Sequence, residues 1–205
     1  MDTEAARQFW NGRYDRPDYL FGEAPNAFLV SQSARLMPGL GALAIADGEG
    51  RNGVWLAERG LSVTTTDIAP RAVEKALALA ARRGVSLDAQ VTDLEHWDWP
   101  EAAFDVIVAI FIQFAPPAAR DRLFARMKAA VRPGGLILMQ GYRPEQIAYG
   151  TGGPRQVENL YTEALLRHAF AGYDILHLEL HDSDVSEGDG HAGRSALIDL
   201  VARRP

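Results

Sequence analysis

The sequence has 205 residues, of which 47% are apolar, and a formal net charge of −6 at pH 7. The length and the apolar fraction predict one α/β domain spanning residues 1–205, and the negative charge disfavours nucleic acid and anionic membranes as partners. No cysteine is present, which excludes disulfides, thiolate catalysis and cysteine-bound metals and fits a cytoplasmic protein.

The N-terminal segment, residues 1–40, is acidic at its start and lacks the apolar stretch of a signal peptide. No apolar run in the chain reaches the roughly 18 residues of a membrane span. Residues 1–30 are rich in aromatic side chains, in which disordered tails are poor, so we expect order here. Two interpretations stay open: a helix docked on the sheet, or a lid over a bound cofactor. A short helix is expected over residues 26–36. The aromatic residues are Phe9, Trp10, Tyr14, Tyr19, Phe21 and Phe28.

A glycine-rich turn follows the first predicted strand, residues 41–46, and a helix is predicted over residues 49–59. Glycine permits positive φ and close approach of a ligand, and a helix N-terminus offers free N–H groups. Such a strand–turn–helix unit is typical of nucleotide-like cofactor sites. The next strand, residues 61–67, ends in Asp67, at a spacing that suits an acid binding ribose hydroxyls.

The turn alone does not choose between cofactors. Gly48, Gly50 and Gly53 spell a literal G-x-G-x-x-G, which favours a dinucleotide, but such a motif by itself is weak. A glycine-rich turn that binds no ligand also remains possible at this point.

Helices and strands alternate through most of the remaining chain. This alternation predicts a doubly wound, Rossmann-like, seven-stranded sheet that is mostly parallel. The last two strands have no helix between them and therefore form an antiparallel C-terminal hairpin. We expect helices over residues 70–84, 117–130 and 162–170, strands over 86–92, 104–112, 136–140, 174–181 and 196–202, a turn over 132–135, and loops over 97–100, 142–153 and 182–193.

This arrangement resembles the class I S-adenosylmethionine-dependent methyltransferases. The resemblance covers residues 41–142 and the closing hairpin, and four features carry it in the right order: the glycine turn, Asp67, Asp93-Leu94, and the turn over residues 132–135, Arg-Pro-Gly-Gly. A dehydrogenase would not require the second acid or the Pro-Gly-Gly turn. It would also usually carry a substrate domain, for which 205 residues leave little room.

A narrower resemblance links the chain to the tellurite-resistance and thiopurine-type methyltransferases. It rests on residues 9–14 (Phe-Trp-Asn-Gly-Arg-Tyr), residues 21–29, and the run from Gly48 to Ala57. The chain departs from the usual motif at two positions: Ala44 stands where an acid is usual, and Ala46 replaces the first glycine. Asp47 is placed to take over the role of that acid toward the methionine amino group.

The resemblance implies S-adenosylmethionine as cofactor, with S-adenosylhomocysteine as product. Asp67 would bind the ribose hydroxyls, Asp93 the adenine amino group, and Ile68 and Ile110 would flank the adenine and ribose. Trp10 and Tyr14 lie four residues apart, on one face of a helix, as candidates for a lid, and Arg13 would pair with the cofactor's carboxylate. The implied cofactor-binding residues are Trp10, Arg13, Tyr14, Ala46, Asp47, Gly48, Gly50, Asn52, Asp67, Ile68, Asp93, Leu94 and Ile110.

Methyl transfer depends mainly on holding donor and acceptor in line, and no residue in the sequence stands out as a catalytic base. Candidates for the acceptor site follow the fourth and fifth strands and the last loop. His177 and His181 alternate with leucines and are expected to be solvated, and no set of residues has metal-ligand spacing. The acceptor-site candidates are Phe111, Gln113, Phe114, Tyr142, Tyr149, Arg155 and His191.

Three hypotheses therefore remain from the sequence. The first is a class I methyltransferase acting on a small-molecule acceptor, as a monomer or homodimer, without nucleic acid or membrane partners. The second is an NAD(P)-dependent oxidoreductase on the same fold. The third is a non-catalytic, regulatory module that only binds the cofactor, which the departures at Ala44 and Ala46 motivate.

Overall fold

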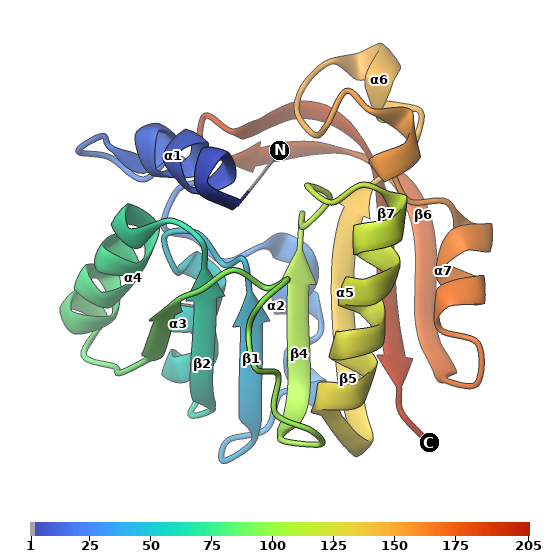
Figure 1. Ribbon diagram of the computed structural model, residues 1–205, viewed down its shortest axis with the longest axis horizontal. Coiled ribbons are helices and arrows are strands. Elements are labelled where there is room, and N and C mark those ends of the chain that lie inside the picture. Colours follow the sequence, from blue (N-terminus) through green and yellow to red (C-terminus); the bar gives the residue numbers. More distant parts are fainter. Residues whose placement is uncertain (1–2) are drawn as a thin grey trace. The chain divides into compact units, whose positions relative to one another are not determined.

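The computed structural model describes residues 3–205. Within this range seven strands form a mixed sheet, mostly parallel, with an antiparallel end made by the last two strands (Figure 1). The predicted fold class is therefore confirmed. The chain divides into two compact units: residues 1–98 with 187–189, and residues 99–186 with 190–205. The prediction of one methyltransferase domain over residues 1–205 stays a prediction.

The first unit contains three parallel strands in the order β3-β2-β1. Its core is formed by the apolar sides of these strands and of the helices that follow them. Helix α4 has Pro70 in its first turn and is followed by Gly84, which has φ +70°. The elements are α1 (Thr3–Tyr14), α2 (Ala27–Ser31), η1 (Ser33–Arg35), β1 (Gly41–Ile45), α3 (Arg51–Glu58), β2 (Ser62–Asp67), α4 (Pro70–Arg83) and β3 (Asp88–Val91).

The second unit contains the strands β4-β5-β7-β6, in which β4 and β5 are parallel and β5 and β7 antiparallel. Its strands are almost wholly buried over β4 and the middle of β5, as the continuous apolar runs of these segments require. The elements are β4 (Phe104–Ile110), α5 (Pro117–Ala130), β5 (Val131–Tyr142), α6 (Gln146–Tyr149), η2 (Val157–Asn159), α7 (Glu163–Ala169), β6 (Asp174–Glu187) and β7 (His191–Arg203).

Three sequence predictions are wrong in detail. Strand β5 begins at Val131, so residues 132–135, predicted as a turn, are an irregular first part of the strand, where the pairing with β4 shifts register. The predicted loop over 142–153 contains α6. The predicted loop over 182–193 is mostly strand, because β6 and β7 extend to a short tip. This segment is polar, so it lacks the alternation of apolar and polar residues that predicts a strand.

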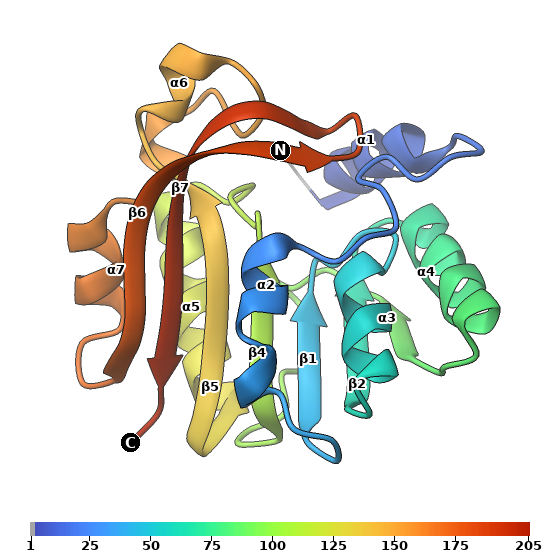
Figure 2. The ribbon, with the colours of Figure 1, turned by 180° about the vertical axis from the view of Figure 1, so that it is seen from behind.

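The N-terminal segment is ordered, as predicted. Helix α1 lies against α4, where Asn11 accepts a hydrogen bond from the backbone N–H of Arg71, and Tyr14 and Leu20 pack on Ala69 and Ala72. The chain after α1 then runs beside the tip of the β6–β7 hairpin, residues 187–189 (Figure 2). Across residues 3–205, none of the helices has both the length and the apolar composition needed to cross a membrane.

Candidate functional site

Asp67, at the end of β2, fixes the glycine-rich turn that follows β1. One carboxylate oxygen accepts a hydrogen bond from the backbone N–H of Gly48 at 2.9 Å, and the other accepts one from the N–H of Ala69 at 2.9 Å. The side chain is buried, and burial raises the pKa of Asp67 to about 6 against these hydrogen bonds. The ends of two neighbouring strands are thereby held together at the turn.

Asp47 holds the other end of the same turn. Its Oδ2 accepts hydrogen bonds from the N–H of Gly53 at 3.0 Å and from the hydroxyl of Thr65 at 3.1 Å. Burial raises the pKa of Asp47 to about 6 as well. A Cβ on Gly53 would lie 2.6 Å from Asp47 Oδ2, so Gly53 is required by this carboxylate rather than by a dinucleotide.

A third carboxylate, that of Glu49, lies buried in the turn and forms an ion pair with Lys75 of α4. Three acidic side chains therefore meet here: Asp47 and Glu49 in the turn after β1, and Asp67 at the end of β2. Such a site is rich in hydrogen-bond acceptors, and Lys75 compensates the charge of Glu49 but not that of Asp47 and Asp67. It suits a ligand that brings hydrogen-bond donors and positive charge.

The backbone of the turn explains its glycines. Gly48 has φ +60°, and a Cβ there would lie 2.8 Å from the hydroxyl of Tyr14; Gly50 has φ +85°, and a Cβ there would lie 2.6 Å from that of Ala76. Ala46 has φ +46°, a left-handed conformation that alanine adopts at a cost. The departure noted in the sequence is thus a strained residue within the turn.

The acid after β3 is held by the N-terminal helix. Asp93 Oδ2 accepts a hydrogen bond from the hydroxyl of Thr3 at 2.7 Å and lies 2.8 Å from His96 Nδ1, while Oδ1 accepts from the N–H of Glu95 at 2.9 Å. Partial burial acts against ionisation, but these hydrogen bonds outweigh it and lower the pKa of Asp93. Leu94 beside it is buried.

The lid candidates of α1 form one aromatic group. Trp10 and Tyr14 stack with ring centroids 5.9 Å apart, and the guanidinium of Arg13 lies 5.0 Å from the centroid of Trp10. Burial, and next the carboxylate of Asp67, raise the pKa of Tyr14 well above its ordinary value. Tyr14 is therefore a neutral phenol beside the glycine turn.

In the second unit, three of the acceptor-site candidates form one aromatic cluster: Phe111, Tyr142 and His191. The ring of Phe111 stacks on Tyr142 at 4.7 Å and on His191 at 4.3 Å between centroids, and the hydroxyl of Tyr142 lies 2.6 Å from His191 Nδ1. Phe111 has φ +55°, which for an aromatic residue is a strained conformation. Strain of this kind is frequent at functional sites, where the surrounding contacts hold it in place.

Gln113 holds the backbone of one member of this cluster. Its side chain is buried, its Oε1 accepts a hydrogen bond from the N–H of Tyr142 at 2.5 Å, and its Nε2 donates to the carbonyl of Tyr142 at 2.8 Å. Gln113 therefore fixes the backbone of Tyr142.

The remaining candidates are placed as follows. Phe114 and Arg155 are exposed, and the hydroxyl of Tyr149 donates to Asp182 at 2.7 Å. Asn52 is buried and accepts a hydrogen bond from the N–H of Asn26 at 2.9 Å. Ile68 is half-buried after β2, and Ile110 is buried at the end of β4.

His181 is not solvated as predicted. Its Nε2 lies 3.2 Å from the buried carboxylate of Asp199, and its Nδ1 lies 2.9 Å from the hydroxyl of Ser183. Burial raises the pKa of Asp199. Over residues 3–205, no group of three or more His, Cys, Asp or Glu side chains is placed to hold a metal ion.

Sequence reasoning missed three contributors to the glycine turn: Lys75, Glu49 and the hairpin tip. Within the first unit, Arg51 at the start of α3 pairs with Glu187 of the tip at 2.6 Å; Arg51 is buried, and the side chain of Glu187 is 12% exposed. A lysine in the middle of an alanine-rich helix was the one available signal, because α4 is otherwise apolar on that face. The partner of Arg51 lies 136 residues away and has no local signal.

Comparison with known proteins finds a family model and curated relatives that match parts of the chain. Residues 42–135 match the methyltransferase domain family. An uncharacterised protein of Mycobacterium tuberculosis (strain ATCC 25618 / H37Rv) is 32% identical over 117 residues, which cover 56% of this chain and 41% of that protein. Hemagglutinin 1 of Eikenella corrodens is 28% identical over 170 residues, 77% of this chain and 52% of that protein. The chain thus spans about half the length, or less, of these curated relatives.

Solved structures share the fold over nearly the whole chain. The structure reported for conversion of a disulfide bond into a thioacetal group during echinomycin biosynthesis has a TM-score of 0.78 at 21% identity, covering 98% of this chain and 91% of that one. Magnesium protoporphyrin IX methyltransferase (ChlM) from Synechocystis PCC 6803, with bound SAH, has a TM-score of 0.76 at 16% identity, with full coverage of both chains. TehB from Haemophilus influenzae has a TM-score of 0.73 at 16% identity, covering 97% of this chain and 67% of that one. Over residues 42–135 the chain is thus similar to the methyltransferase domain family, and it shares the fold of these solved structures.

Proposed function

We propose that this chain transfers the methyl group of S-adenosylmethionine to a small-molecule acceptor. The observation that carries the proposal is the acidic glycine turn, with the carboxylates of Asp47, Glu49 and Asp67. S-adenosylmethionine brings a sulfonium, an ammonium and two ribose hydroxyls, all of which favour carboxylate acceptors. A dinucleotide would bring a pyrophosphate to the same turn and would be repelled.

The residues of the first unit fit this cofactor by their chemistry. We propose that Asp67 accepts from the ribose hydroxyls and Asp47 from the methionine ammonium, and that Asp93 with Leu94 receives the adenine. Gly48 and Gly50, with their positive φ, would let the backbone of the turn approach the cofactor, as Asn52 would at the start of α3. Trp10, Arg13 and Tyr14 would cover the cofactor, with Ile68 against its flat groups; for Ile110, in the second unit, the same role is proposed from the sequence alone.

When bound, S-adenosylmethionine supplies an electrophilic methyl group on a positively charged sulfur. The protein's part is to position the acceptor and exclude water, which supplies most of the rate gain in such a transfer. We propose that Phe111, Tyr142 and His191 contact the acceptor, with Gln113 acting through Tyr142. Phe114, Tyr149 and Arg155 are proposed for the outer part of the acceptor site.

The test is a transfer assay with a panel of acceptors of different chemistry: thiols, selenide and tellurite, aromatic amines, phenols and carboxylates. Release of S-adenosylhomocysteine is measured with each acceptor, and a cofactor-only reaction gives the background. Turnover with at least one acceptor supports the proposal. Binding of the cofactor without turnover on any acceptor favours the non-catalytic module, and binding of NADH in its place favours the oxidoreductase.

A further inference from the structure

Lys75 is a buried cation at the glycine turn. The chain contains two lysines, Lys75 and Lys128, among 21 basic residues, so arginine is the usual cation of this protein. Lys75 lies in the middle of α4, its side chain is only 8% exposed, and its ion-pair partner Glu49 is 2% exposed. Burial of both ions is costly unless each is satisfied by further contacts, so this pair requires an explanation.

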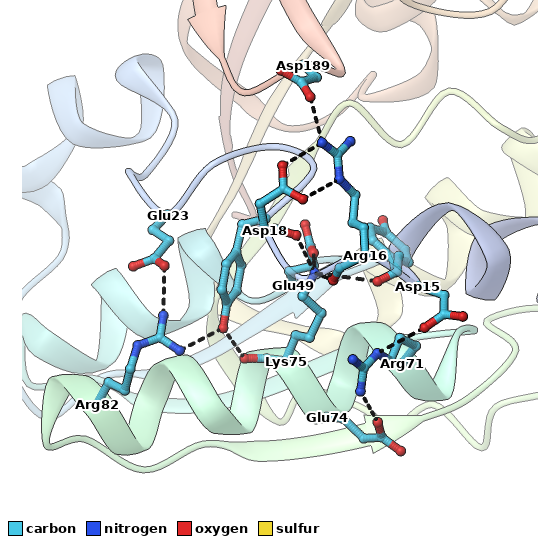
Figure 3. Close-up of polar contacts among 12 residues, drawn as sticks. Asp15, Arg16, Asp18, Glu23, Glu49, Arg71, Glu74, Lys75, Arg82 and Asp189 are labelled. Atoms are coloured by element: carbon cyan, nitrogen blue, oxygen red, sulfur yellow. Dashed lines mark hydrogen bonds and ion pairs between the residues drawn. The ribbon is translucent and has the colours of Figure 1, made fainter.

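The ammonium of Lys75 also binds the chain that follows α1. It donates to the backbone carbonyls of Tyr14 at 3.4 Å, Arg16 at 3.1 Å and Asp18 at 2.6 Å, and it lies 4.8 Å from the ring centroid of Tyr19 (Figure 3). The carbonyls of these alternate residues all face the Nζ atom of Lys75. A compact ammonium with three donors can bind them, whereas a planar guanidinium cannot. The segment is thus wrapped around Lys75.

We call residues 10–27 the cap. Lys75 joins the cap to the glycine turn, since its other partner, Glu49, lies between Gly48 and Gly50. Neither carboxylate oxygen of Glu49 has a hydrogen-bond partner among residues 3–205, so the ion pair with Lys75 is what compensates this charge. The same cation therefore neutralises the turn and orients the cap.

The hairpin tip holds the cap from its other side. Arg16 pairs with Asp189 at 2.7 Å, and Asn26 donates to Glu187 at 2.9 Å. Gly188 lies so close to the cap that a Cβ there would be 2.4 Å from the carbonyl of Leu20. With the tip on one side and Lys75 on the other, the cap has one defined position.

The position of the cap determines which side chain lies against the glycine turn. Tyr14, whose carbonyl Lys75 binds, has its hydroxyl in the space next to Gly48. We propose that Lys75 is a positioning residue: by binding Glu49 and the carbonyls of the cap together, it sets Tyr14 against the glycine turn before the cofactor binds. The proposal rests on the proposed function, in that the turn is taken as the cofactor site.

Two roles of Lys75 must be separated, namely compensation of a buried charge and orientation of the cap. Lys75→Met removes the cation at similar volume and leaves Glu49 buried and unpaired. Glu49→Gln together with Lys75→Met removes both charges, so that no buried ion remains. If Lys75 only compensated the buried charge, the double variant would regain stability and would bind the cofactor as well as Glu49→Gln alone, which has lost the same acid of the turn.

The experiment measures thermal unfolding and the Kd for S-adenosylmethionine in wild type, K75M, E49Q, E49Q/K75M and K128M. Lys128 is the matched control, because its ammonium also donates to a backbone carbonyl, that of Ala169 at 2.7 Å, in the second unit. We expect K75M to lose both stability and affinity, and E49Q/K75M to regain most of the stability while its Kd stays at least tenfold above that of E49Q. Limited proteolysis within residues 13–20 should be faster in both, and K128M should match wild type in Kd.

A Kd of E49Q/K75M equal to that of E49Q would overturn the proposal, as would unchanged proteolysis of the cap. Failure of the proposed function gives a different result, since the wild type and K128M would then bind no S-adenosylmethionine at all. In that case the positioning role of Lys75 is overturned together with the proposed function.

Discussion

The carboxylate of Asp67, at the end of β2, accepts a hydrogen bond from the N–H of Gly48 at 2.9 Å, and so couples the second strand to the turn after the first. In the proposed function the same carboxylate receives the ribose of the cofactor. In that proposal Asp67 both shapes the site and binds the cofactor. Asp88, on β3, is exposed and accepts hydrogen bonds from the side chains of Thr64 and Gln90.

We predict that Asp67→Asn weakens S-adenosylmethionine binding at least tenfold. A charged acceptor toward hydroxyl donors is worth roughly 1.5–3 kcal/mol, and the amide loses one acceptor oxygen as well. Equilibrium dialysis measures the change, with Asp88→Asn as the control that removes an acid from the exposed end of a neighbouring strand. Equal affinity in wild type and Asp67→Asn would show that the ribose is bound elsewhere.

Ala46→Gly should stabilise the protein. Ala46 has φ +46°, where a Cβ costs about 1–2 kcal/mol, and the gain is reduced by the extra freedom of glycine in the unfolded chain, about 0.5–1 kcal/mol. We expect a net gain of about 0.5–1 kcal/mol, seen as an increase in Tm. The control is Ala44→Gly, two residues earlier in the extended strand β1, which should lower Tm. A fall of Tm in Ala46→Gly would contradict the assigned strain.

Stability and cofactor binding should depend on pH in opposite directions. The pKa values of Asp47 and Asp67 are raised to about 6 by burial, so the folded state binds protons more tightly than the unfolded chain. Their contribution to stability is therefore fully present near pH 4 and is lost as the pH rises through about 6. For Asp67 alone, the loss amounts to about 3 kcal/mol at most. Carboxylates whose pKa is lowered, such as Asp93, act in the opposite sense at lower pH.

The affinity for S-adenosylmethionine, by contrast, requires ionised carboxylates and should fall as the pH is lowered from 7.5 to 5. Urea unfolding and Kd measured across this range test both trends. In Asp67→Asn the pH dependence of stability between pH 4 and 6 should be smaller. An affinity that is constant down to pH 5 would contradict the role given to these two acids.

Tyr142→Phe should slow the reaction with the acceptor and leave the binding of the cofactor unchanged. The change removes only the hydroxyl that lies 2.6 Å from His191 Nδ1, a hydrogen bond worth about 1 kcal/mol, and so frees the imidazole from its defined orientation. We expect kcat/KM for the acceptor to fall about fivefold, with an unchanged Kd for S-adenosylmethionine. The matched control is Tyr161→Phe, because Tyr161 is buried and its hydroxyl has no hydrogen-bond partner among residues 3–205. Equal effects of the two changes would remove Tyr142 from the acceptor site.

Glu187→Gln tests the attachment of the hairpin tip. Glu187 pairs with Arg51 in a buried ion pair and accepts a hydrogen bond from Asn26, so the change leaves a buried guanidinium without its counter-ion. We expect a loss of about 3 kcal/mol in the free energy of unfolding, measured by urea denaturation. Glu163→Gln, at an exposed pair with Arg167, should cost less than about 0.5 kcal/mol. A loss no larger than that of the control would show that the tip is not held by this pair.

The sequence predicted what depends on local pattern. Alternating helices and strands, the turn from Asp47 to Gly50 and the acids after β2 and β3 all follow from short-range spacing, and the structure has them at the expected strand ends. Phe111 and Tyr142 were predicted as acceptor-site residues because each follows a predicted strand, and His191 because it lies in the polar segment between the last two; their stacking on one another was not predicted.

What the sequence did not predict depends on distant partners. The long hairpin of β6 and β7 has polar residues where a strand usually alternates, and its tip is placed by ion pairs with Arg16 and Arg51. Lys75 was not singled out from the sequence, because several of its partners are backbone carbonyls, which no side-chain pattern reveals.

The most direct test of the account is calorimetric titration of the purified protein with S-adenosylmethionine, S-adenosylhomocysteine and NADH. The acidic turn predicts micromolar binding of the first two and no binding of NADH, whose pyrophosphate meets the carboxylates of Asp47 and Asp67. Binding of NADH without binding of S-adenosylmethionine would contradict the central claim and assign the turn to an oxidoreductase. Binding of none of the three would contradict it as well, and would leave a methyltransferase fold whose glycine turn serves no cofactor.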